Sequence, residues 1–157
     1  MSMKSGVKIP SLLAGVAGVA GEYFVAAELS RRGYIASISL RNTRGIDILA
    51  TNQDASRTIT IQCKTNQLGL KAWMLNEKSE EFHAENHYYV FVALGNPILR
   101  PNYHIVPSAT VAEFITENHK KWLGTPGSKG QPHVDTPVRK FIDPDDNFLE
   151  CWDLLGL

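Results

Sequence analysis

The chain has 157 residues, of which 43% are hydrophobic and 20% are charged, and this balance is typical of a globular domain rather than a disordered or fibrous chain. Sixteen basic residues balance sixteen acidic ones, which argues against binding of nucleic acid through overall positive charge. Any phosphate binding must come from a local basic patch. Cys63 and Cys151 form no CxxC or metal-ligand spacing, which argues against a disulfide framework and fits a reducing cytoplasm.

The length favours one compact domain over residues 12–157, preceded by a flexible lead-in over residues 1–11. Residues 12–20 are the longest apolar stretch near the start. Gly15 and Gly18 interrupt this stretch, which is too short to span a membrane, so we expect no membrane segment.

A first helix is predicted to end at Gly33, a residue type that commonly terminates helices. Its apolar face recurs at three- and four-residue steps and contains Val19, Val25, Ala26 and Leu29. Glu22 lies in the middle of that face, where an isolated carboxylate would be costly to bury.

Three strands are expected next, over residues 34–40, 45–51 and 58–65, and a polar turn joins the last two as a hairpin. A helix is predicted over residues 76–85, followed by a continuous apolar strand over residues 88–94 that is typical of a sheet centre.

The chain then predicts a short strand over residues 103–106, a helix that begins at Ser108 and a long loop over residues 124–137. Asp143 and Pro144 match the start of a short C-terminal helix. The order αβββαβ indicates the α/β class, with a mixed central sheet flanked by helices and a C-terminal helical extension.

Alternation along residues 59–64 places Gln62 and Lys64 on one side of their strand, about 7 Å apart. Asp47 lies opposite the apolar side of the preceding strand, and hairpin pairing can bring it beside Gln62. A carboxylate, an amide oxygen and the Cys63 carbonyl are hard ligands of the sort that magnesium takes. Lys64 could stabilise charge that develops on a phosphate, and Glu22 would be reasonable opposite a cation.

These motifs, in this order, resemble those of the PD-(D/E)xK superfamily, which has the restriction-endonuclease-like fold. The resemblance covers about the first 65 residues and is closest to small Holliday-junction resolvases and to homing endonucleases with an IQxKT strand. It is carried by Gly21-Glu22 with Ala26, Leu29 and Gly33, by GIDILA over residues 45–50, and by IQCKT over residues 61–65.

The resemblance implies magnesium- or manganese-dependent hydrolysis of phosphodiester bonds, with DNA as the expected substrate. It makes Asp47 and Gln62 metal ligands, Lys64 the catalytic base or charge stabiliser, and Glu22 the carboxylate of the first helix. Two features depart from the family pattern. Gly45 and Ile46 replace the proline that often precedes the aspartate, and Gln62 replaces an acid, so metal binding should depend more on Glu22 and Asp47.

Nucleic-acid contacts are predicted at basic and aromatic residues outside the catalytic set. These are Arg44, Lys71, Trp73, Lys120, Lys121 and Lys129. For the late lysines, a phosphate-contacting flap and a solvated charge run are equally good interpretations.

Two rival functions stay open at this stage. The first is a non-catalytic nucleic-acid-binding or interaction module that keeps the fold, which Gln62 and the zero net charge favour. The second is a small-molecule enzyme that uses His119 or His133, although no coherent motif surrounds either residue. A single small domain that acts on two strands would suit a symmetric homodimer.

Overall fold

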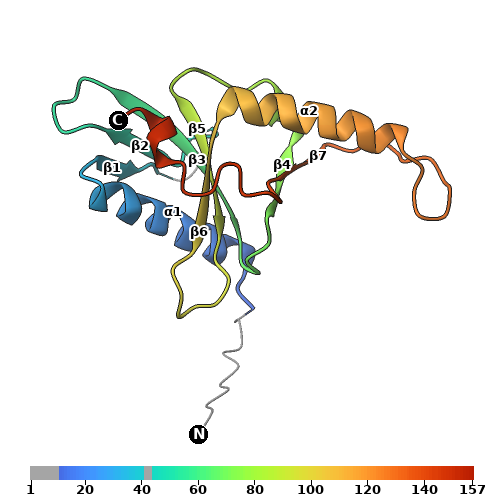
Figure 1. The fold of residues 1–157 in the computed structure, drawn as a ribbon, viewed down its shortest axis with the longest axis horizontal. Coiled ribbons are helices and arrows are strands. Elements are labelled where there is room, and N and C mark those ends of the chain that lie inside the picture. Colours follow the sequence, from blue (N-terminus) through green and yellow to red (C-terminus); the bar gives the residue numbers. More distant parts are fainter. Residues whose placement is uncertain (1–10, 41–43) are drawn as a thin grey trace, which may run out of the picture.

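The computed structural model describes residues 11–40 and 44–157 (Figure 1). Residues 1–10 of the expected lead-in lie outside the described residues. The elements that form the main layers are α1 (Ala14–Arg31), β1 (Ile35–Ile38), β2 (Ile48–Thr51), β3 (Thr58–Asn66), β5 (His87–Ala93), β6 (Asn102–Pro107) and α2 (Ser108–Gly124). Within the described ranges, no helix combines the length and apolarity needed to cross a membrane.

A five-stranded mixed sheet forms the centre of the molecule, in the order β1-β2-β3-β5-β6. Strands β1, β2 and β3 pair antiparallel, β3 and β5 pair parallel, and β5 and β6 pair antiparallel. All seven residues of β5 are buried, as expected for a strand that is covered on both faces. The mixed α/β sheet predicted from the sequence is therefore confirmed.

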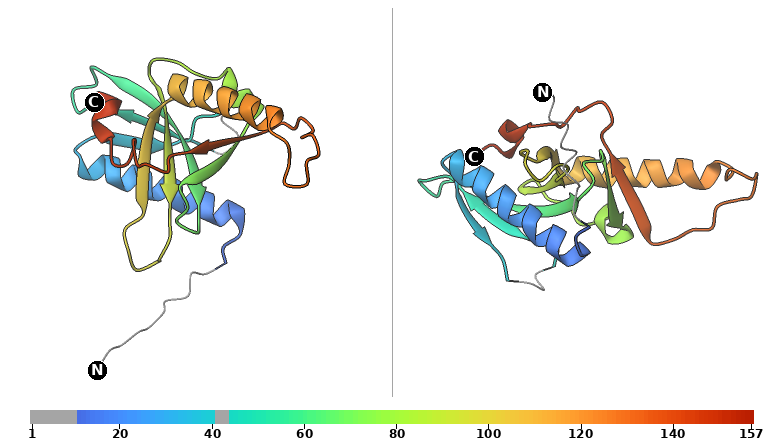
Figure 2. Two further views of the ribbon diagram at one scale, coloured as in Figure 1. Left: turned by 45° about the vertical axis from the view of Figure 1, so that its right-hand side comes forward. Right: turned by 90° about the horizontal axis from the view of Figure 1, so that it is seen from below.

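Two hydrophobic clusters lie on opposite faces of this sheet, because alternate side chains of a strand point to opposite sides. On one face, α1 packs Val25 and Leu29 against Ile61. On the other face, α2 packs Ile115 against Phe91. Figure 2 shows α1 along one side of the sheet and α2 reaching away on the other.

The approach of α1 to β3 depends on a glycine. A Cβ atom at Gly21 would lie 1.9 Å from the Thr65 hydroxyl oxygen, so any larger residue would push the helix away from the strand. Glu22 is the next residue along α1, and this close contact fixes its height above β3.

Between β3 and β5 the structure differs from the sequence prediction. The helix expected over residues 76–85 is wrong, because the segment forms β4 (Ala72–Asn76) followed by one 3-10 turn, η1 (Glu77–Glu80). The strand β4 pairs with β7 (Val138–Ile142) in a second, two-stranded sheet. The Asn76 side chain accepts the Lys78 backbone N–H and so begins the 3-10 turn.

The expected C-terminal helical extension is also absent from the described residues, which contain only the 3-10 turn η2 (Trp152–Leu155) in that region. Asp143 accepts the backbone N–H groups of Asn147 and Phe148, which holds a turn where the helix was expected. Asp146 and Glu150 then adopt positive φ values of 58° and 56°, a conformation that an α-helix cannot contain.

Candidate active site

The β2–β3 hairpin brings Asp47 beside Gln62. The antiparallel register of the hairpin ends at the pair Ile48 and Ile61, and Asp47 comes just before Ile48. The Asp47 backbone N–H donates at 2.9 Å to the carbonyl of Ile61, the partner of Ile48, so the regular ladder is interrupted at Asp47. The Asp47 side chain turns toward β3, where its Oδ2 accepts the Cys63 backbone N–H at 2.7 Å.

Burial raises the pKa of Asp47 above its ordinary value, while the Cys63 N–H and the charge of Lys64 oppose that increase. The pKa of the Cys63 thiol is also raised well above its usual range, first by burial and then by the negative charges of Asp47 and Glu22. Glu22, Asp47 and Lys64 therefore all lie within electrostatic reach of the Cys63 thiol.

Glu22 reaches this region from a different side than the other three predicted residues. It is half-buried on α1, the helix that covers the opposite face of the sheet from Gln62 and Lys64. Gln62 and Lys64 share one face of β3, the Asp47 carboxylate lies at the Cys63 N–H between them, and Glu22 lies near the Cys63 thiol on the α1 side.

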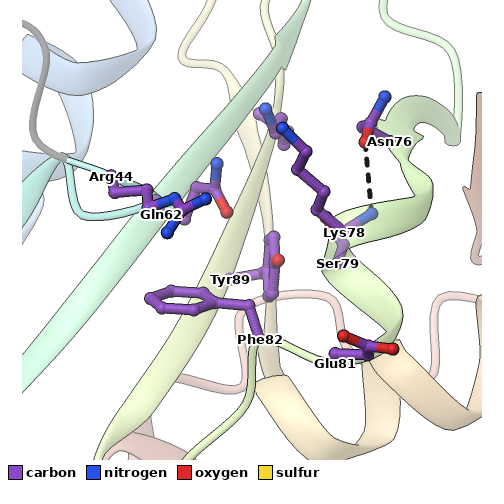
Figure 3. A pocket seen from close by; sticks show the side chains of 10 residues that line it. Arg44, Gln62, Asn76, Lys78, Ser79, Glu81, Phe82 and Tyr89 are labelled. Atoms are coloured by element: carbon purple, nitrogen blue, oxygen red, sulfur yellow. Dashed lines mark hydrogen bonds between the residues drawn. The ribbon is translucent and has the colours of Figure 1, made fainter.

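A cavity of about 570 Å³ opens over the face that carries Gln62 and Lys64 (Figure 3). Figure 3 shows Arg44 entering from one wall and Lys78 from the other, with Gln62 and Tyr89 between them. The described residues around it are Arg44, Gly45, Gln62, Lys64, Asn76, Lys78, Ser79, Glu81, Phe82 and Tyr89. Three of these residues are basic and one is acidic, so a chain with no net charge has a local basic patch here.

Tyr89 forms part of the cavity floor because the parallel register of β3 and β5 sets it directly beside Gln62. The residue is fully buried, and its hydroxyl has no hydrogen-bond partner of normal geometry within the described residues. Burial raises the pKa of Tyr89, and the negative charge of Asp47 adds to that increase, although the nearby Ser79 hydroxyl opposes it.

Phe82 closes one end of the cavity by packing against Gly45. Gly45 has a φ of 65°, and a Cβ atom there would lie 2.8 Å from Phe82 Cε1. The Phe82 ring also meets His87 edge-on, with centroids 4.9 Å apart. The Phe82 ring is therefore held between the loop before β2 and the start of β5.

Among the predicted nucleic-acid contacts, Arg44 lines the cavity, but Trp73 does not contact it. The prediction that Trp73 contacts the substrate is wrong. Trp73 is 2% exposed, and its Nε1–H donates to the Val92 carbonyl in the core. Lys71 is exposed, but it is engaged by the Pro144 carbonyl and the Asp146 carboxylate.

The three late lysines lie apart from the cavity. Lys120 and Lys121 are in the last turns of α2, and Lys129 is in the loop that follows. Figure 1 shows that this loop projects beyond the end of α2, away from the central sheet. Lys120 pairs with Glu117 of its own helix at 3.1 Å.

Sequence reasoning missed six cavity residues, which are Asn76, Lys78, Ser79, Glu81, Phe82 and Tyr89. Lys78, Ser79 and Phe82 were assigned to a regular helix, whereas the 3-10 turn is what aims Lys78 across the cavity. Tyr89 lies in a uniformly apolar run, and only its register opposite Gln62 distinguishes it from its neighbours. No local sequence signal would have identified that register.

Hard oxygen donors near Asp47 could hold a divalent cation, although no group of three or more His, Cys, Asp and Glu side chains with metal-site geometry occurs in the described residues. The histidines proposed for a rival enzyme have other contacts. His119 Nε2 lies 2.7 Å from Asp135 Oδ1, and His133 stacks on Trp122 with centroids 4.1 Å apart.

No protein-family model matches this chain, and neither does any curated protein sequence. Among solved structures, a bacterial homing endonuclease is similar over 93% of this chain and 94% of its own, with a TM-score of 0.55 and 10% sequence identity. A Holliday junction resolvase from the archaeal hyperthermophile Archaeoglobus fulgidus matches over 80% of this chain and 84% of its own, with a TM-score of 0.46 and 16% identity. The similarity to the homing endonuclease shows that the fold is restriction-endonuclease-like, as the sequence motifs predicted.

Proposed function

We propose that this protein is a metal-dependent nuclease that hydrolyses phosphodiester bonds of DNA. The observation that carries the proposal is that the Asp47 carboxylate accepts the N–H of Cys63, the residue between Gln62 and Lys64, within reach of the Lys64 charge. The adjoining basic cavity supports it, because phosphate binding in a chain of zero net charge needs such a patch. The homodimer, the cytoplasmic location and the single domain over residues 12–157 stay predictions.

Magnesium or manganese would be held by the Asp47 carboxylate, the Gln62 amide oxygen and the Cys63 carbonyl, with Glu22 adding negative charge nearby. The donor set fits a hard cation, and the half-buried Asp47 carboxylate is a group that a cation would stabilise. When bound, such an ion polarises a phosphate and lowers the pKa of water.

Lys64 has the role of stabilising negative charge that develops on the phosphate in the transition state. It lines the cavity on the Gln62 side and interacts with the charge of Asp47. Preorganised groups of this kind contribute about 3 kcal/mol to catalysis. Arg44 and Lys78, both exposed on opposite walls, would hold the flanking phosphates of the substrate.

A second candidate is a nucleic-acid-binding module that keeps the fold without catalysis. Two observations favour it: Gln62 offers an oxygen without a charge, and one oxygen of Asp47 already accepts the Cys63 N–H. Both candidates use the same basic cavity, so only cleavage and metal binding separate them.

The test is cleavage of plasmid, linear and branched DNA, and of RNA, with magnesium or manganese. Asp47→Ala should abolish cleavage while DNA binding stays equal or becomes tighter, because an anion near phosphate is removed. Asp145→Ala is the matched control, since Asp145 is exposed in the turn after β7. Lys64→Ala should lower the rate about 150-fold, whereas Lys140→Ala, at an exposed position of β7, should not.

Gln62→Glu separates the two candidates because it adds a charge to the proposed metal shell. An active enzyme should keep cleavage and bind metal more tightly, and a non-catalytic module could gain cleavage that the parent lacks. The nuclease proposal is wrong if the parent cuts none of the substrates with either metal and Asp47→Ala leaves metal binding unchanged.

A further inference from the structure

The size of the cavity is the first reason to expect a single nucleotide as its ligand. Its volume of about 570 Å³ falls within the range of pockets that enclose a small ligand. The contact between Phe82 and Gly45 closes one end, and basic side chains enter from two sides. A continuous duplex needs a surface that stays open along its length.

Phe82 supplies an aromatic surface at this closed end. It is 39% exposed, and its position is fixed by the edge-on contact with His87 and by the absence of a side chain at Gly45. An exposed aromatic ring that is already held in place can stack on a base with little loss of conformational freedom. Bases inside a duplex are covered by their neighbours, so only an unpaired base could reach the ring.

The floor of the cavity provides an independent sign of a polar ligand. The buried Tyr89 hydroxyl has no hydrogen-bond partner of normal geometry in the described part of the chain. Buried polar groups in native proteins are normally satisfied, and a group left without a partner lowers stability. Figure 3 shows Tyr89 between Gln62 and Phe82, and because its hydroxyl is buried, a polar group of a bound ligand would reach it when these side chains move apart.

We propose that the cavity takes up one unpaired nucleotide, with its base on Phe82 and its phosphates between Arg44 and Lys78. The preferred ligand is then single-stranded or locally opened DNA rather than continuous duplex. This inference rests on the proposed function for its assignment of the ligand as DNA, and it names the form of DNA that the same site selects.

The experiment measures binding of fluorescent DNA in calcium, without cleavage, to the full chain. The probes share one sequence and are a single strand, a blunt duplex and a duplex with one unpaired base. The single strand and the bulged duplex should both bind at least tenfold more tightly than the blunt duplex. Equal or tighter binding of the blunt duplex overturns the inference, and so does tighter binding of an RNA strand of the same sequence.

The matched variants are Phe82→Ala and Phe24→Ala, because Phe24 is 43% exposed on α1, outside this cavity. Phe82→Ala should weaken single-strand binding by about fivefold to 150-fold, the effect of one base stacked on an aromatic side chain, and leave duplex binding unchanged. Phe24→Ala should change neither affinity. Equal effects of the two variants on single-strand binding overturn the inference.

Tyr89→Phe gives a second measurement that does not depend on removing a ring. It should leave the thermal unfolding midpoint equal or higher, because a buried hydroxyl without a partner is removed. Single-strand affinity should fall by about twofold to tenfold, the loss of one hydrogen bond. If the single-strand affinity of Tyr89→Phe equals that of the parent, Tyr89 does not contact the ligand and the proposal of a nucleotide pocket is wrong.

The same data keep this inference separate from the nuclease proposal. If no DNA is cut with magnesium or manganese but Phe82 still determines single-strand preference, the nuclease proposal fails and the nucleotide pocket stands. If duplex DNA is cut and Phe82→Ala has no effect on binding, the nuclease proposal stands and the nucleotide pocket fails.

Discussion

The buried carboxylate of Glu28 fastens the C-terminal end of α1, the helix that carries Glu22. Arg100 binds it through two hydrogen bonds of 3.0 and 2.9 Å, Arg31 donates at 3.0 Å, and Arg32 also donates to it. The hydrogen bonds from Arg100, and then those from Arg32, lower the pKa of Glu28 from 4.5 to about 2, against the effect of burial. Its side chain is only 7% exposed, so solvent screens these contacts weakly.

We predict that Glu28→Gln lowers the free energy of unfolding by about 3 kcal/mol at pH 7, because each unit of pKa shift corresponds to about 1.4 kcal/mol. A folded-state pKa below the unfolded value gives stability that is complete above pH 4.5 and is lost as the pH falls toward 2. The difference between parent and variant should therefore shrink to about 1.4 kcal/mol at pH 3.

The assay is urea unfolding of parent and Glu28→Gln at pH 7 and pH 3, with Glu117→Gln as a control on an exposed helix position. Glu150 also has a lowered pKa, so the parent loses further stability in acid. Because Glu150 binds the same Arg100 as Glu28, the difference between parent and variant also contains the coupling between the two carboxylates. A loss of equal size at both pH values would mean that Glu28 stabilises α1 by packing rather than by charge.

Three further predictions concern the site. Gly45→Ala should cost at least about 1–2 kcal/mol in urea unfolding, because φ is 65° and the new methyl would displace Phe82; a stability equal to the parent would contradict this. Burial raises the pKa of Asp47, so the charged carboxylate lowers the stability of the folded protein at high pH. In metal-free buffer, Asp47→Asn should therefore raise the thermal unfolding midpoint at pH 8 and leave it unchanged in acid, where the carboxyl group is protonated. Replacing Arg44 and Lys78 with Gln should reduce by about two the slope of log affinity for DNA against log salt concentration. Replacing Lys120, Lys121 and Lys129 should reduce this slope further if the late loop contacts phosphates.

The hairpin of the site could be predicted because its signals are local. Alternation over residues 59–64 and the short polar turn before it determine which side chains share a face, and the register of residues 48–51 against 58–61 agrees. The same holds for β5, whose apolar run is too short and too continuous for a surface helix. Local periodicity was sufficient wherever pairing joined neighbouring segments.

The second sheet could not be predicted, because its two strands are far apart in the sequence. β4 and β7 pair Trp73 with Phe141 across a separation that no local pattern records. Without β7, the alternation of Trp73 and Leu75 inward is too short to distinguish from irregular chain. This is why Trp73 was assigned to the substrate surface, and why the wall that carries Lys78 was missed.

An uncharged residue at position 62 suits the electrostatics of its surroundings. Asp47 is already half-buried beside Gln62, and burial already raises its pKa. A second carboxylate at position 62 would raise that pKa further, because two like charges at this distance cannot both ionise cheaply without a cation. It would also place a negative charge beside Tyr89, at the floor of the cavity that is proposed to bind phosphate. In the proposed nuclease, Gln62 would keep an oxygen for the metal while Arg44, Lys64 and Lys78 make the cavity basic, so the site would attract DNA before any metal is bound.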